Sequence, residues 1–81
     1  MKYNKEDLIN EIKNLINNRD FYFASQKLYQ LSRKYPESEE LYSLQGLVFY
    51  HYQKYNLAIE YLTISLSLKY NSKTAFNLSI I

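Results

Sequence analysis

Apolar residues recur at helical spacing in short segments that polar residues separate. In the first segment, four of them follow the i, i+4, i+7, i+8 spacing of one helical face: Leu8, Ile12, Leu15 and Ile16. Polar residues 17–20 interrupt this stripe, and further stripes follow. The pattern predicts an all-α chain of about five helices, near residues 5–17, 21–34, 39–53, 56–69 and 73–80.

Helix start and stop signals support these boundaries. Three residues at predicted helix starts have a side-chain oxygen that can cap a helix N-terminus: Asn4, Ser38 and Ser72. Asp20 is a candidate cap for the second helix, and Tyr35-Pro36 should end it because the residue before proline disfavours the helical conformation. The chain has one Gly and one Pro, which favours helices joined by short loops over a turn-rich β protein.

The apolar and capping positions repeat along the chain at a constant spacing, the one that separates Ala24 from Ala58. We call this spacing the repeat offset. The capping candidates share it, and so do core positions: Leu15 with Phe49, Phe21 with Tyr55, and Leu28 with Leu62. Short loops make successive helices antiparallel. We therefore expect a single domain, 1–81, with one repeat at about 5–38, a second at about 39–72 and a partial third at 73–81.

The repeated unit resembles the tetratricopeptide repeat. The repeat offset matches the period of that family, about 34 residues. Residues 42–50 and 53–62 are similar to its pattern of aromatic, Gly, aromatic and then Tyr-x-x-Ala-Ile. The resemblance covers most of the chain and implies helical hairpins stacked in a short right-handed superhelix. Gly46 should pack closely against Ala58. The chain departs from the pattern at four places: Ile12 replaces Gly, Glu11 and Gln45 replace Leu, and Tyr70 replaces the closing proline.

The resemblance also implies a function. In the family, the first helix of each hairpin lines a concave groove that holds another protein. Carried over by position, the groove would present these residues: Ile9, Lys13, Ile16, Ser43, Leu47, Tyr50, His51 and Asn77. This set is largely apolar and aromatic, which favours an amphipathic helix or an apolar peptide as the ligand.

A second class of ligand known for the family, a C-terminal carboxylate, matches the residues of this chain less well. Some members grip a C-terminal carboxylate with Lys, Arg and Asn side chains. The matching positions here are Ile9, Lys13, Leu44, Thr74 and Leu78. Only Lys13 suits such a clamp, so the sequence argues against it.

Other readings of the chain stay open. It could be a small chaperone of a secretion or assembly complex, an adaptor, or a fragment of a longer repeat scaffold. Leu47 and other groove residues could instead be core. Binding of single-stranded nucleic acid through Tyr stacking and Lys is a further alternative. Against nucleic acid, the ten Tyr fall mostly at repeat positions that packing explains, and no basic stripe is present.

The last predicted helix has an apolar face where a terminal repeat helix is usually polar. Its residues are Phe76, Leu78, Ile80 and Ile81. We expect another chain to cover this face, either a second copy in a homodimer or a different partner, unless it is the cut surface of a longer array.

Composition narrows the chemistry further. The chain has no Cys and one His, so the sequence predicts no metal site, no cofactor and no enzyme activity. Glu39 and Glu40 are adjacent and would point in different directions on a helix, which disfavours a paired-carboxylate site.

The start lacks a signal-peptide pattern, and no apolar run could span a membrane. We expect a soluble, cytoplasmic protein with a weak net charge of +2.

Overall fold

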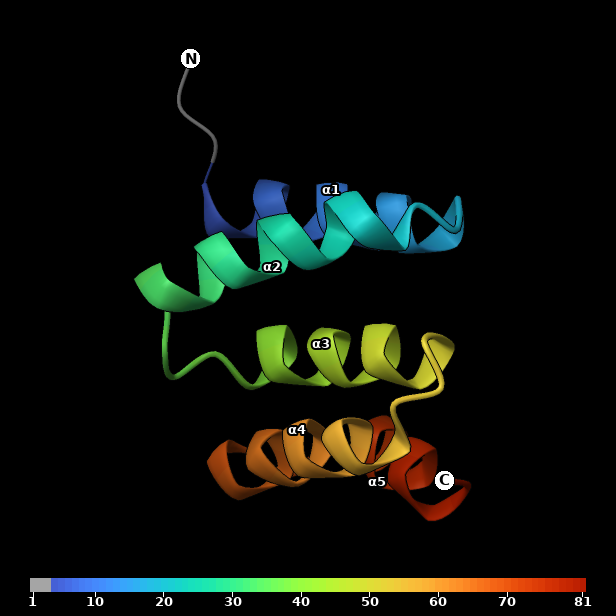
Figure 1. Cartoon of the computed structure of the whole chain (residues 1–81). Helices are drawn as coiled ribbons and strands as arrows, with labels where there is room; N and C mark the ends of the chain where they lie inside the picture. The colour runs from blue at the N-terminus through green and yellow to red at the C-terminus, as the bar shows by residue number, and fades with distance from the viewer. Residues whose placement is uncertain (1–3) are drawn as a thin grey trace.

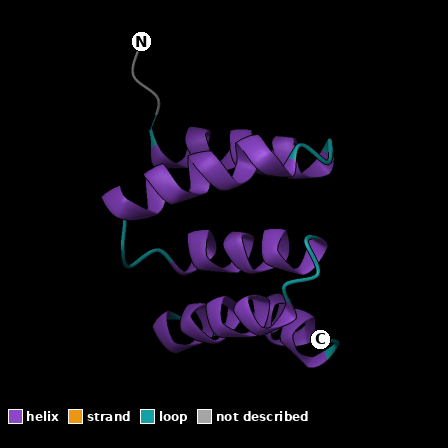
Figure 2. Ribbon diagram, viewed as in Figure 1, coloured by secondary structure: helices purple, strands orange, loops and turns teal. Residues whose placement is uncertain are grey.

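The protein is all-helical over residues 4–81, the part of the chain that this computed structural model describes (Figure 1). Residues 1–3 of the predicted domain lie outside that range. No strand occurs among the described residues, and short loops join the helices (Figure 2). The helices are α1 (Lys5–Asn17), α2 (Phe21–Lys34), α3 (Glu39–His51), α4 (Tyr55–Leu68) and α5 (Ser72–Ser79).

Successive helices run antiparallel and stack in one direction. Figure 1 shows the α1–α2 hairpin at one end, α3 in the middle, and α4 with α5 at the other end. Each helix packs mainly on its neighbour in the chain, and α1 also contacts α3. The molecule measures 40 × 25 × 19 Å, and its radius of gyration is 12.0 Å. These observations confirm the predicted stack of helical hairpins.

The helix N-termini correct part of the capping prediction. Asn4 caps α1, because its side-chain oxygen accepts a hydrogen bond from Asp7 N at 2.8 Å. The residue that caps α5 is Asn71 rather than Ser72, and its Oδ1 accepts from two backbone N–H groups of the first turn. Ser38 and Asp20 occupy cap positions but make no side-chain capping bond. The cap residues therefore repeat less strictly than their sequence spacing suggested.

The two hairpin turns have the same backbone structure. Arg19 and Gln53, which the repeat offset relates, both have φ of 61°. Each turn closes with the 6→1 and 5→2 bonds of a Schellman motif. In the first turn Arg19 N donates to Ile16 O at 3.0 Å and Asp20 N to Leu15 O at 2.8 Å. In the second turn the equivalent bonds are Gln53 N to Tyr50 O and Lys54 N to Phe49 O, both 2.9 Å.

The main apolar core lies where α1, α2 and α3 meet. Ala24, Leu28 and Leu41 are fully buried there, and Ile12 is 1% exposed. The second helix ends as predicted, with Tyr35 as its C-cap directly before Pro36. The apolar stripes that recur in the sequence are therefore the faces that pack against each other.

Gly46 lets the second hairpin close more tightly than the first. A Cβ atom on Gly46 would lie 2.7 Å from Leu62 Cγ and 3.3 Å from the Ala58 carbonyl oxygen. The equivalent residue of the first hairpin is Ile12, whose larger side chain is buried in the core. The α3–α4 contact is accordingly much more extensive than the α1–α2 contact. This confirms the predicted close approach and explains why the two hairpins differ.

None of the helices in residues 4–81 has the length and apolar character that crossing a membrane requires.

Candidate functional site

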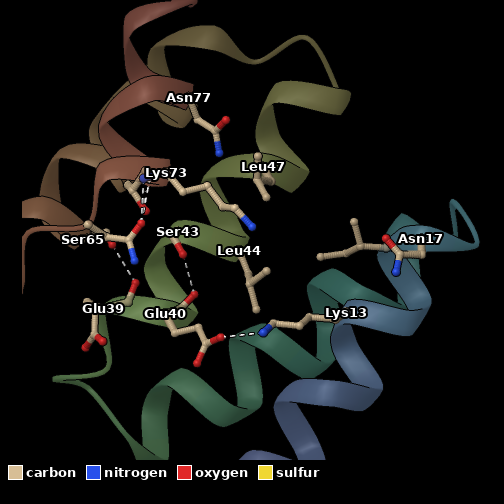
Figure 3. A pocket seen from close by; sticks show the side chains of 13 residues that line it. Lys13, Asn17, Glu39, Glu40, Ser43, Leu44, Leu47, Ser65, Lys73 and Asn77 are labelled. Atoms are coloured by element: carbon tan, nitrogen blue, oxygen red, sulfur yellow. Dashed lines mark hydrogen bonds and ion pairs between the residues drawn. The ribbon is translucent and has the colours of Figure 1, made fainter.

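A groove of about 510 Å³ runs along the face formed by α1, α3 and α5, the first helices of the successive hairpin units. Figure 3 shows side chains from all three helices directed toward it. Residues of one helical face supply each wall. They are Lys13, Ile16 and Asn17 of α1, then Glu39, Glu40, Ser43, Leu44 and Leu47 of α3, Ser65 of α4, and Asn71, Lys73, Thr74 and Asn77 in and before α5.

The repeat explains why these side chains meet. The repeat offset makes Lys13 equivalent to Leu47, and Ser43 equivalent to Asn77. Residues three or four apart share a helical face. Because α1, α3 and α5 lie on the same side of the stack, their equivalent faces line one continuous surface.

The groove contains a narrow apolar strip made by Ile16, Leu44 and Leu47. Leu44 is 7% exposed and belongs to the core, and the half-buried Leu47 packs against the same core. Leu47 therefore serves as both core and groove lining. The remaining lining residues are polar or charged, and none is aromatic. The groove is thus less apolar than expected and has no aromatic lining: polar side chains surround an apolar strip of comparable area.

Two lysines enter the groove from opposite walls. Lys13 Nζ lies 2.7 Å from Glu40 Oε2, and this ion pair joins α1 to α3. Both side chains are nearly half exposed, so water screens the pair and weakens its contribution to stability. Lys73 projects from the first turn of α5 toward the apolar strip (Figure 3). Within residues 4–81 no carboxylate lies within ion-pairing distance of Lys73.

Hydrogen bonds hold the α5 side of the groove in place. The Oδ1 atom of Asn71 accepts from Lys73 N at 2.9 Å and from Thr74 N at 3.1 Å. Ser65 is buried, and its Oγ donates to the Glu39 carbonyl oxygen at 2.7 Å. The first bonds order the turn that carries Lys73, and the last ties α4 to the start of α3. These groove walls are therefore positioned before any ligand binds.

The structure brings together five of the eight residues predicted for the groove: Lys13, Ile16, Ser43, Leu47 and Asn77. Ile9 is only 4% exposed and lies in the apolar core instead.

Tyr50 and His51 also lie outside the groove lining. They occupy the last turn of α3, where the start of α2 comes close. The His51 ring stacks on Phe21 at 4.5 Å between centroids, and the Tyr50 ring lies 5.6 Å from that of Tyr55. Aromatic rings attract one another at this edge of the stack, so these side chains turn toward their ring partners.

Sequence reasoning missed several lining residues for different reasons. Asn17 follows Lys13 by one helical turn and could have been found by the same spacing. Lys73 lies inside the last predicted helix, but its repeat position was not among those carried over to the groove. Ser65 belongs to a second helix of a hairpin, and only the packing of α4 on α3 brings it to the groove.

Aromatic side chains gather elsewhere. A second cavity, of about 340 Å³, opens between α2, α3 and α4, and Tyr29, Phe49, Tyr52 and Tyr61 line it. On the predicted C-terminal face, Phe76 and Ile80 are 64% and 57% exposed, whereas Leu78 and Ile81 are half-buried. Across residues 4–81 no three His, Cys, Asp or Glu side chains are grouped as metal ligands would be.

Comparison of the chain with models of protein families, with curated proteins and with solved structures finds no match. The resemblance to tetratricopeptide repeats therefore rests on the residues of this chain alone.

Proposed function

We propose that the protein is an interaction module that binds a segment of another protein in the groove between α1, α3 and α5. The observation that carries this proposal is the groove itself, which equivalent faces of three helices line. The resemblance to tetratricopeptide repeats, whose first helices hold protein ligands, supports the same conclusion.

The residues that line the groove indicate what kind of protein segment would bind there. The strip formed by Ile16, Leu44 and Leu47 would accept apolar side chains spaced along one face of a helix. Asn17 and Asn77 can hydrogen-bond polar groups at the borders of that strip. Lys73 favours an acidic residue next to the apolar ones. An amphipathic helix with an acidic flank meets these requirements better than a wholly apolar peptide.

A photocrosslinking experiment can identify the bound segment. We would place a benzophenone amino acid at position 47 and irradiate the protein in an extract of its source cells. The matched control carries the same group at Tyr29, which is 62% exposed on the opposite face of the stack. Mass spectrometry should find a protein crosslinked from position 47 and absent from the control.

The identified segment would then be synthesised and its affinity measured by calorimetry. Leu47→Asp and Lys73→Glu should each weaken binding at least about tenfold, because each removes about 1.4 kcal/mol or more of favourable contact. Tyr50→Ala should leave the affinity unchanged, since Tyr50 does not line the groove. Circular dichroism checks that each variant keeps its helices. The proposal fails if the groove variants bind normally or if only the Tyr29 probe crosslinks.

A further inference from the structure

The cavity between α2, α3 and α4 lies apart from the groove, and the two have no lining residue in common. We call it the aromatic cavity. Leu28 and Val48 line it although both are almost completely buried, so they form its floor. Rings from three helices and one turn make its walls: Tyr29 of α2, Phe49 of α3, Tyr52 after α3, and Tyr61 of α4. Its lining is therefore mainly apolar and aromatic, unlike that of the groove.

The walls of the aromatic cavity favour a planar ring as the ligand. Aromatic side chains attract a further ring by offset stacking or by edge-to-face contact. Phe49 and Tyr61 already contact each other, with 5.0 Å between their centroids. The Tyr29 side chain is 62% exposed. It therefore offers an accessible aromatic surface to a ligand that lies on the apolar floor.

One polar group in the wall lacks a partner. Gln45 lines the aromatic cavity, and its Oε1 atom is buried without a hydrogen-bond partner among residues 4–81. A buried acceptor that stays unpaired is unfavourable. The Nε2 atom of the same amide donates to Ser32 Oγ over a long 3.3 Å. Because the terminal torsion of Gln is broad, the amide can rotate and present Oε1 to an N–H or O–H group of a ligand.

The charge around the aromatic cavity is positive. Lys54 is exposed and lines it. The Arg33 guanidinium lies over the Tyr29 ring, 5.8 Å from its centroid. Among the described residues no carboxylate lines the cavity, and none forms an ion pair with either cation. The cavity is therefore complementary to an anionic group placed at its rim.

We propose that the aromatic cavity binds a small planar aromatic acid whose ring carries an N–H or O–H donor. The ring lies on the apolar floor beside Tyr29, its donor meets Gln45 Oε1, and its carboxylate meets Lys54. A Tyr or Trp side chain of another protein has a ring and a donor but no anionic group of its own, so the cations favour a free acid. This site is independent of the groove and of the function proposed for it.

Three matched compounds test the proposal. Indoleacetate has the ring, the donor and the carboxylate, whereas naphthaleneacetate lacks the donor and indole ethanol lacks the carboxylate. For a ligand of this size we expect indoleacetate to bind with a Kd of about 1 mM or below. Each of the other two should bind at least about fivefold more weakly, because one interaction is missing. Heteronuclear NMR titration measures the affinities and locates the site.

The NMR signals that move distinguish this site from the groove. The backbone amides of Leu28, Gln45 and Phe49 should shift, and those of Ser43 and Leu47 in the groove should not. Shifts confined to the groove, or equal affinities of the three compounds, would overturn the proposal. It also fails if none of them binds at about 5 mM, several times the expected Kd. Water would then be the partner of Gln45 Oε1.

Two substitutions test the roles of the polar side chains. Gln45→Met keeps a similar shape without the amide, so it should weaken indoleacetate to the level of naphthaleneacetate and leave naphthaleneacetate unchanged. Lys54→Gln should weaken indoleacetate about threefold, since an exposed charge contributes modestly. Lys69→Gln is the matched control, at an exposed position outside the cavity, and should have no effect. Circular dichroism checks the fold of each variant. If Gln45→Met weakens both acids equally, the amide only shapes the cavity and the proposed hydrogen bond is wrong.

Discussion

Gly46 shows how a single residue determines the packing of two helices. Glycine within a helix is less favourable than alanine by about 1 kcal/mol. Here the glycine allows Leu62 to occupy the space that a Cβ atom would need. Leu62 is fully buried as a result, and its burial contributes about 1.5–3 kcal/mol. The packing gain therefore exceeds the loss in helix propensity.

Gly46→Ala should lower the free energy of unfolding by about 1–2 kcal/mol, because overpacking in a core outweighs the gain in propensity. In a Leu62→Ala background the same substitution should instead be neutral or stabilising, since the clashing side chain is absent. Urea unfolding of the two single variants, the double variant and the native protein measures the difference. Equal effects in both backgrounds would show that Leu62 does not limit the space at Gly46.

At the scale of the helices, the two hairpin turns have an unusual backbone. Both hairpin turns are Schellman motifs, yet each places a non-glycine residue, Arg19 or Gln53, at φ of 61°. The left-handed conformation costs an L-residue about 1–2 kcal/mol. The turns form because four backbone hydrogen bonds and the packing of the flanking helices outweigh that cost. The chain therefore lacks the glycine signal that usually marks such turns.

Gln53→Gly should raise the free energy of unfolding by about 0.5–1 kcal/mol, because glycine adopts this conformation without strain. Gln53→Val should destabilise by a similar or larger amount, since a β-branched residue tolerates positive φ poorly. Thermal unfolding followed by circular dichroism measures both. The Gln53 side chain is exposed to solvent, which keeps the comparison simple. Destabilisation by glycine would indicate that the side chain itself supports the turn.

At the scale of the whole molecule, stability depends on the core shared by α1, α2 and α3. Leu28 lies at its centre and is completely buried. A domain of this size has a free energy of unfolding of only about 4–12 kcal/mol. Because the first hairpin packs on α3 of the second hairpin, loss of packing on that side of α3 should weaken the entire stack.

Leu28→Ala should lower the free energy of unfolding by about 2–5 kcal/mol through lost burial and the cavity left behind. Leu57→Ala is the matched control, and it should cost less than about 1 kcal/mol because Leu57 is already 37% exposed. Urea titration followed by circular dichroism compares the two. Similar midpoints would mean that the stack does not depend on this core.

Much of the architecture follows directly from the chain. The apolar stripes, Pro36 and the repeat offset predict all five helices, with boundaries that differ from the observed ones by at most two residues. This works because helix formation and burial of one face depend mainly on spacing along the sequence. The close approach at Gly46 also follows from sequence, since few other features justify a glycine within a helix.

The chemistry of the groove was decided by tertiary structure. Whether an apolar residue at a groove position is lining or core depends on which helix covers it: Ile9 is core, whereas Leu47 belongs to both. Tyr50 and His51 turn away because ring partners from α2 and α4 lie beside them. Ser65 reaches the groove only through helix packing. Spacing therefore determined which helices exist and which faces are apolar, while contacts between distant residues determined what the groove presents to a ligand.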